Sequence, residues 1–212
     1  MHSVDVDPPW DADAWRQSAR AALRAGVPPD ALSWNGEAQG GLGFGSDLSS
    51  LPVVRESPRV SADFLSLASA VLCHRDPHRH GLLYRLLWRI SAGERALLER
   101  ATDADVHRAR ELEKAVRRDN HKMKAFVRFR EIPGEADTFV SWFEPQHYIV
   151  ERVAPFFARR FAGMRWAILT PEACLRWAAD ADVLERQVRA FHPAPGAWTQ
   201  LDQQVIKVWR AQ

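Results

Sequence analysis

Two hydrophobic periods divide this chain, and they constrain its fold more than any other feature of the sequence. Between residues 61 and 118, apolar side chains recur every three or four positions, which is typical of amphipathic helices. In 125–143 and 164–169, the pattern is instead that of strands. Helices followed by strands predict an α+β fold. We expect a helical N-terminal half packed on a small antiparallel sheet with one covering helix.

Caps and chain breakers delimit the helices expected in the first half. Ser61 and Asp76 are suited to the N-cap position, and Pro77 is suited to the first helical position that follows. The second and third of these helices read as a packed hairpin, because the third is too apolar to lie open in a DNA groove. The expected helices cover residues 11–25, 61–74, 77–90, 94–100 and 103–118.

The second half predicts a hairpin of strands 125–131 and 138–143, a helix over 148–161 and a strand over 164–169. Pro155 predicts a kink or break in that helix. The segment ending at Trp177 could form a short helix or a strand, and two further helices are expected over 182–191 and 198–210. We expect three segments: 1–60 as an N-terminal helix and linker, 61–177 as the α+β core domain, and 178–212 as C-terminal helices.

Composition favours a soluble cytoplasmic protein. The 212 residues are 46% hydrophobic, which is enough for a substantial core, but no apolar run approaches the roughly 20 residues of a membrane span. The N-terminus carries acids where a secretory signal would be basic. Cys73 and Cys174 have no zinc-like spacing, so we expect both to be buried and reduced.

Positive charge is concentrated in one part of the chain. Residues 75–130 contain 15 Lys and Arg against 8 Asp and Glu, an excess of +7, whereas the net charge of the whole chain is +2. A localised basic region favours an anionic partner such as DNA. The structural alternative is a set of solvated helix faces rich in arginine.

Cations gather where the period changes, in the stretch 117–130. The first arginines there suit the negative end of a helix, but the later cations have no such explanation. Phosphate contacts require only cations and hydrogen-bond donors. The candidate nucleic-acid-binding residues are Arg118, His121, Lys122, Lys124, Arg128, Arg130, Arg159 and Arg160.

A catalytic site is also conceivable. If the hairpin forms, His121 at the start of its first strand approaches Glu144 and His147 at the end of its second. These three groups could perform acid–base chemistry, contact a ligand, or make structural hydrogen bonds. No metal-ligand spacing supports a metal centre, and the glycine-rich segment 41–45 lacks the strand and the Lys-Ser/Thr of a phosphate loop. We expect no metal and no cofactor.

Several segments together resemble a bacterial DNA-metabolism domain of unassigned activity. The resemblance extends over roughly residues 10–177 and is carried by 64–74, 83–89, 121–129 (His-Lys-Met-Lys-Ala-Phe-Val-Arg-Phe), 142–147 (Trp-Phe-Glu-Pro-Gln-His), 155–161 and 166–170. That domain occurs fused ahead of a uracil-DNA glycosylase superfamily domain or is encoded beside a radical SAM protein. The resemblance implies a DNA-repair context but no catalytic residues. Because no glycosylase-like segment follows, we do not expect uracil excision from this polypeptide.

Three function hypotheses follow. The first is a DNA-binding accessory domain of repair. The second is an enzyme acting on DNA or a nucleotide through His121, Glu144 and His147. The third is an interaction module that docks a uracil-DNA glycosylase or radical SAM partner through exposed tryptophans.

Overall fold

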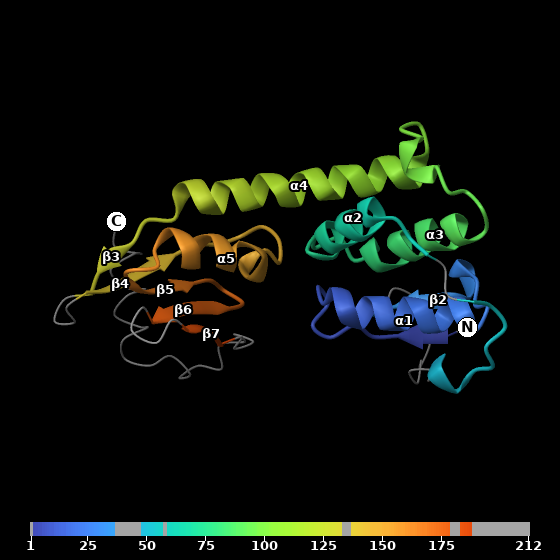
Figure 1. Cartoon of the computed structure of the whole chain (residues 1–212), viewed down its shortest axis with the longest axis horizontal. Coiled ribbons are helices and arrows are strands. Elements are labelled where there is room, and N and C mark those ends of the chain that lie inside the picture. Colours follow the sequence, from blue (N-terminus) through green and yellow to red (C-terminus); the bar gives the residue numbers. More distant parts are fainter. Residues whose placement is uncertain (1, 37–47, 57–58, 133–136, 179–182, 188–212) are drawn as a thin grey trace. The chain divides into compact units, whose positions relative to one another are not determined.

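A computed structural model describes residues 2–36, 48–56, 59–132, 137–178 and 183–187. The chain divides into two compact units, Met1–Arg117 and Arg118–Gln212, whose boundary falls inside one long helix, α4 (Ala104–Phe126). Figure 1 shows the helices α1 to α5 and the strands β2 to β7 with their labels.

The first unit is helical. It contains α1 (Ala12–Arg24), α2 (Ala62–Leu72), α3 (Arg79–Ser91) and the beginning of α4. Two short parallel strands, β1 (His2–Val4) and β2 (Leu32–Trp34), accompany them. The remaining elements are the 3-10 turns Pro29–Ala31, Leu48–Ser50 and Leu97–Glu99.

Side chains of the flanking residues fix where these helices begin. Asp11 Oδ1 accepts hydrogen bonds from the backbone N–H groups of the first turn of α1, and Ser61 Oγ accepts one from Phe64 N at 3.2 Å. Asp103 caps α4 in the same way. Each cap satisfies donors that have no partner within the helix. The predicted Ser61 cap is therefore confirmed.

The core of the first unit is built on aromatic side chains. Trp15, Trp34, Phe64 and Tyr84 are each at most 1% exposed, and Trp34 packs against both Trp15 and Tyr84 with ring centroids about 6 Å apart. Four leucines of α3 are buried as well, namely Leu82, Leu83, Leu86 and Leu87. Burial of this apolar surface supplies the main stabilisation of the unit.

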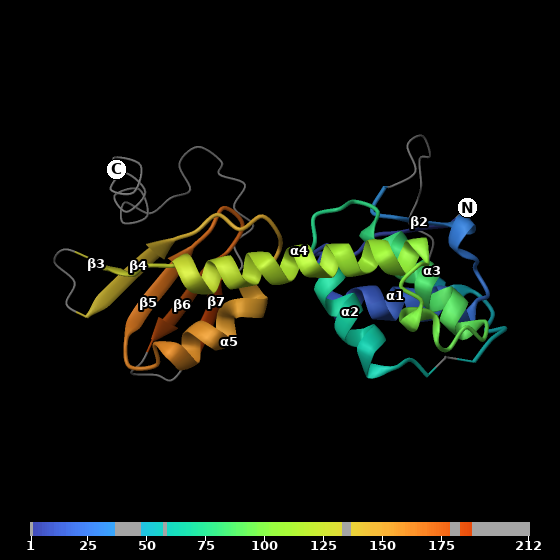
Figure 2. The ribbon, with the colours of Figure 1, turned by 90° about the horizontal axis from the view of Figure 1, so that it is seen from above.

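The second unit places one helix on a sheet. The sheet runs in the order β3 (Arg130–Glu131), β4 (Thr138–Trp142), β5 (Arg165–Leu169), β6 (Cys174–Ala178), β7 (Val183–Gln187). The helix α5 (Val150–Arg160) connects β4 to β5 and covers one face of the sheet (Figure 2). Phe157 of α5 packs against Trp166 of β5, and Phe129 contacts both rings.

The α+β class and the covering helix are confirmed, but the sheet is not purely antiparallel. β4 and β5 pair in parallel, whereas the other neighbours are antiparallel. A helical crossover between two strands returns the chain to the same end of the sheet, so the strands it joins run in the same direction. The division of the chain at residues 60 and 177 stays a prediction.

Three predicted elements were wrong. The strand expected from 125 to 131 begins only at Arg130, because α4 continues through Phe126 and Val127 N still donates to Met123 O. Of the helix expected over 94–100, only a 3-10 turn forms. The helix expected over 182–191 contains strand β7 instead.

Other predictions have mixed outcomes. The segment ending at Trp177 is a strand, and α5 continues through Pro155 without a break. The helix expected over 198–210 and the glycine-rich segment 41–45 lie outside the described residues. Cys73 and Cys174 are buried and are not joined in a disulfide, as predicted. None of the described helices combines the length and the apolar composition that a membrane span requires.

Candidate nucleic-acid interface

The last turns of α4 present four basic side chains to solvent. Arg118, His121, Lys122 and Lys124 are all exposed, and they are called the basic end of α4 below. The sequence predicted that His121 lies at the start of a strand, which is wrong, because α4 continues through Phe126. On a helix these four side chains instead occupy one broad face, because residues three and four apart are neighbours.

Buried residues on the other side of α4 fix this orientation. Asp119 and Met123 are 2% and 0% exposed, and Asp119 Oδ2 accepts a hydrogen bond from His147 N at 2.9 Å. Each residue advances about 100° around a helix, so His121 projects about 200° away from Asp119. The anchoring of Asp119 therefore turns the basic end outward.

The basic end of α4 differs from the arginine-rich segment before it in how its cations are paired with carboxylates. Arg89 bonds to Glu94 and Asp103, and Arg110 bonds to Asp63 and Glu113. Further cations paired with acids are Arg85, Arg100, Arg108 and Lys114. Those faces match the structural alternative of solvated, charge-balanced helices.

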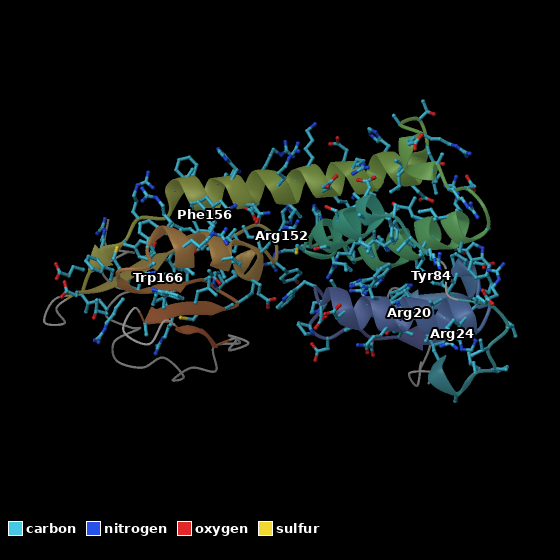
Figure 3. All side chains as sticks on the ribbon, in the orientation of Figure 1. Arg20, Arg24, Tyr84, Arg152, Phe156 and Trp166 are labelled. Carbon is cyan, nitrogen blue, oxygen red and sulfur yellow. The ribbon has the colours of Figure 1, made fainter. Side chains whose placement is uncertain are left out.

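The basic end of α4 is not balanced in this way. Within the described part of the chain, Arg118, Lys122 and Lys124 form no ion pair with a carboxylate. Lys124 Nζ instead lies 5.0 Å from the centre of the Phe156 ring, a residue of α5 labelled in Figure 3. A cation–π contact leaves the positive charge available to an anion.

The other candidate cations have different surroundings. Arg128 is exposed, but its Nη1 donates to Ala125 O at 2.6 Å and to Val127 O at 3.0 Å, so it caps the end of α4. Arg130 is exposed on β3. Arg159 and Arg160 are exposed in the last turn of α5, where cations offset the negative end of the helix dipole. Arg128, Arg159 and Arg160 therefore each have a structural role at the end of a helix that does not require DNA.

The three candidate acid–base residues do not share one face. Glu144 is exposed and accepts a hydrogen bond from Trp142 Nε1 at 3.0 Å. His147 is half-buried beside Asp119, on the side of α4 opposite to His121. The segment 144–147 therefore does lie next to α4, but through Asp119. Acid–base chemistry by these residues stays a prediction.

The described residues contain no group of three or more His, Cys, Asp or Glu side chains placed to hold a metal ion. They also contain seven of the nine tryptophans, and each of the seven is buried or half-buried. Docking of a partner through exposed tryptophans thus gains no support from this part of the chain.

A second basic surface lies on α1, where the sequence predicted only an N-terminal helix followed by a linker. A hollow of about 360 Å³ on α1 is lined by Arg16, Arg20 and Arg24 together with three neighbouring residues. Arg16 is paired with Asp13, but Arg20 and Arg24, both labelled in Figure 3, have no ion-pair partner among the described residues. The spacing of four residues between these arginines was the available signal.

Comparisons with known proteins identify one family. A family model described as a domain of unknown function, DUF4130, matches residues 77–211, which include the basic end of α4. Methionyl-tRNA formyltransferases of Burkholderia multivorans, Burkholderia ambifaria and Burkholderia cenocepacia are 56% identical over 41 residues, 19% of this chain and 12% of theirs. The chain therefore spans about an eighth of those relatives' length. No solved structure matches significantly.

Proposed function

We propose that this chain, which belongs to the DUF4130 family, is a DNA-binding accessory domain that contacts phosphates through the basic end of α4. The observation that carries the proposal is the change in charge pairing along the basic region. Six of its earlier cations are paired with carboxylates, namely Arg85, Arg89, Arg100, Arg108, Arg110 and Lys114. In the last turns of α4, Arg118, Lys122 and Lys124 are exposed and have no carboxylate partner within the described residues.

The arrangement suits a phosphate backbone. Cations on one rigid helix face are held in a fixed spacing, and an exposed cation loses less by binding phosphate than one that must first leave a carboxylate. His121 lies between the cations on the same face and can donate a hydrogen bond to a phosphate oxygen. Arg128 and Arg130, which follow α4 in the sequence, are exposed as well.

The proposal predicts steep salt dependence. Neutralising three duplex phosphates gives a slope of about −2.7 in log K against log salt concentration. Raising the salt from about 50 to about 200 mM would then weaken duplex binding about 40-fold. A protein left with one contact would weaken only about 3-fold over the same range.

Fluorescence anisotropy of labelled DNA tests this with the full chain. The double variant Lys122→Ala/Lys124→Ala should lower the affinity and reduce the slope by about 1.8 on duplex and about 1.4 on single strands. The absence of binding to either form at about 50 mM salt, or an unchanged slope in the variant, would refute the proposal.

Two matched controls decide whether the surface is the correct one. Lys114→Ala removes a lysine from the same helix that is already paired with Glu111, and the salt slope should not change. Arg20→Ala/Arg24→Ala removes two unpaired arginines from the α1 hollow, and it should also leave the slope unchanged. If this second variant reduces the slope as much as the lysine variant, the interface has been assigned to the wrong surface.

The repair context is a further part of the proposal and depends on the resemblance to the DNA-metabolism domain. A uracil-DNA glycosylase or a radical SAM protein acting on DNA would be the expected partner. The test is co-purification of the tagged chain with a glycosylase or radical SAM protein expressed beside it. Binding that survives nuclease treatment would support a protein contact, and its loss would indicate that DNA alone bridges the two.

A further inference from the structure

An exposed aromatic side chain ends the basic helix. Phe126, the last residue of α4, is 66% exposed, whereas phenylalanine is normally buried. The other large apolar side chains that are exposed within the described residues are aliphatic: Val53, Val54 and Leu65. An aromatic ring in water at this place requires an explanation.

Packing within the protein does not supply one. Phe129, Phe157 and Phe161 form edge and stacked ring pairs under α5. No ring pair among the described residues includes Phe126, and the cation of Lys124 lies over Phe156 instead. Both faces of the Phe126 ring therefore have no aromatic or cationic neighbour in this part of the chain.

The ring lies one helical turn from a phosphate-binding candidate. Phe126 follows Lys122 by four residues, a rise of about 6 Å along the helix, so the two side chains are neighbours on its surface. A cation and a free aromatic face at this separation can hold the two ends of one nucleotide, its phosphate and its base. Single-strand-binding proteins combine these same two elements.

We infer that Phe126 stacks on an unpaired base, so that the basic end of α4 binds single-stranded DNA in preference to duplex. The inference rests on the proposed function and names its substrate class. A duplex already covers both faces of each base with its neighbours, which leaves nothing for the ring to stack on. A single strand or a displaced base exposes those faces while offering the same phosphates to Lys122 and Lys124.

Binding of a single-stranded oligothymidylate and of the matched duplex, measured by anisotropy, tests the inference. Phe126→Ala should weaken single-strand binding about 5- to 150-fold, the range for loss of one stacked base, and change duplex binding less than about 2-fold. Phe126→Trp should keep the affinity, because it retains a π face. Phe126→Leu should lose most of it, because it retains only apolar volume.

Three comparisons separate the loss of base stacking from a loss of charge and from a loss of folding. The salt slope of Phe126→Ala should equal that of the wild type, because no phosphate contact is lost. An oligonucleotide of abasic sugar-phosphate units should bind Phe126→Ala and wild type equally. Leu65→Ala removes another exposed apolar side chain, in α2, and should change neither affinity.

The possible failures are distinguishable. If Lys122→Ala/Lys124→Ala weakens binding but Phe126→Ala does not, the stacking inference is wrong and the proposed function stands. An equal loss of duplex and single-strand affinity in Phe126→Ala also overturns the inference. If the wild type binds neither form, the proposed function fails and the inference fails with it.

Discussion

A buried histidine should make the stability of the first unit depend on pH. His80, in the first turn of α3, is 1% exposed, and its Nε2 lies 2.8 Å from Pro9 O. A carbonyl can only accept, so Nε2 carries the proton of the neutral ring. Burial, reinforced by the adjacent Arg79 cation, lowers the pKa of His80 to about 4.

The sign and size of the effect follow from the difference between this pKa and that of the unfolded chain, about 6.5. Between pH 6.5 and 4, His80 is protonated in the unfolded chain but neutral in the folded protein. The free energy of unfolding therefore falls as the pH falls. Above this window His80 contributes no pH dependence. Between pH 7 and pH 5 the loss amounts to about 2 kcal/mol.

Urea denaturation at pH 7 and pH 5 measures this loss. His80→Gln keeps an amide donor for Pro9 O but cannot titrate, so its loss between the two pH values should be smaller than that of the wild type by about 2 kcal/mol. His107→Gln replaces an exposed histidine of α4 and controls for the removal of an imidazole. Equal losses in wild type and His80→Gln, or an NMR titration of His80 near pH 6.5, would refute the reasoning.

Three further substitutions test interactions inside the units, two in the first unit and one in the second. Tyr84→Phe removes the buried hydrogen bond to Val27 O at 2.6 Å and should cost about 1–3 kcal/mol in urea denaturation. Gly26→Ala should cost about 1 kcal/mol or more in the same assay, because φ is +70° and the added methyl group would lie 2.8 Å from a valine Cγ2. Asp119→Ala removes the acceptor of the His147 N–H and should speed hydrogen exchange of that amide, whereas an unchanged exchange rate would show that this bond does not anchor α4.

Local signals predicted α1 and α2 well, whereas α3 begins at Arg79 after His78 rather than after the expected Asp76 cap, and 94–100 forms only a 3-10 turn. The Ser61 cap forms as expected, and α1 begins and ends within one residue of its predicted limits. The inward leucines of α3 follow from the 3.6-residue period alone. In these segments propensity, caps and apolar spacing all favour the same structure, so no tertiary information was needed.

The end of α4 could not be predicted because two periods overlap there. Met123 and Val127 are both buried and four residues apart, which fits a helix. Val127 and Phe129 alternate with exposed neighbours, which fits a strand. Both patterns are correct for part of this stretch, because the helix ends at Phe126 and an extended segment follows. Hydrophobic periodicity over so few residues cannot show at which residue the helix ends.

The direction and partners of the strands could not be predicted from the sequence for a different reason. The parallel alignment of β4 and β5 depends on where α5 returns the chain, which is a property of the whole unit. Strand β7 carries Glu185, Arg186 and Gln187 in succession, a composition that also suits an exposed helix. Its partner β6 supplies the hydrogen bonds that decide between the two.

Charge pairing, like strand pairing, depends on contacts between distant residues that the sequence does not show. This matters for the proposed interface, which is argued from unpaired cations. The sequence shows an excess of +7 in residues 75–130 but not which cations are neutralised in space. Arg110 is paired with Asp63, 47 positions earlier and outside that segment, and Arg108 is paired with Asp76, 32 positions earlier. Asp63 offsets one charge of that excess, and Asp76 is already counted in it, so the fold mainly decides which cations have a carboxylate partner. The charge available to a phosphate is that of the cations without such a partner, and in the last turns of α4 these include Arg118, Lys122 and Lys124, on which the proposed interface rests.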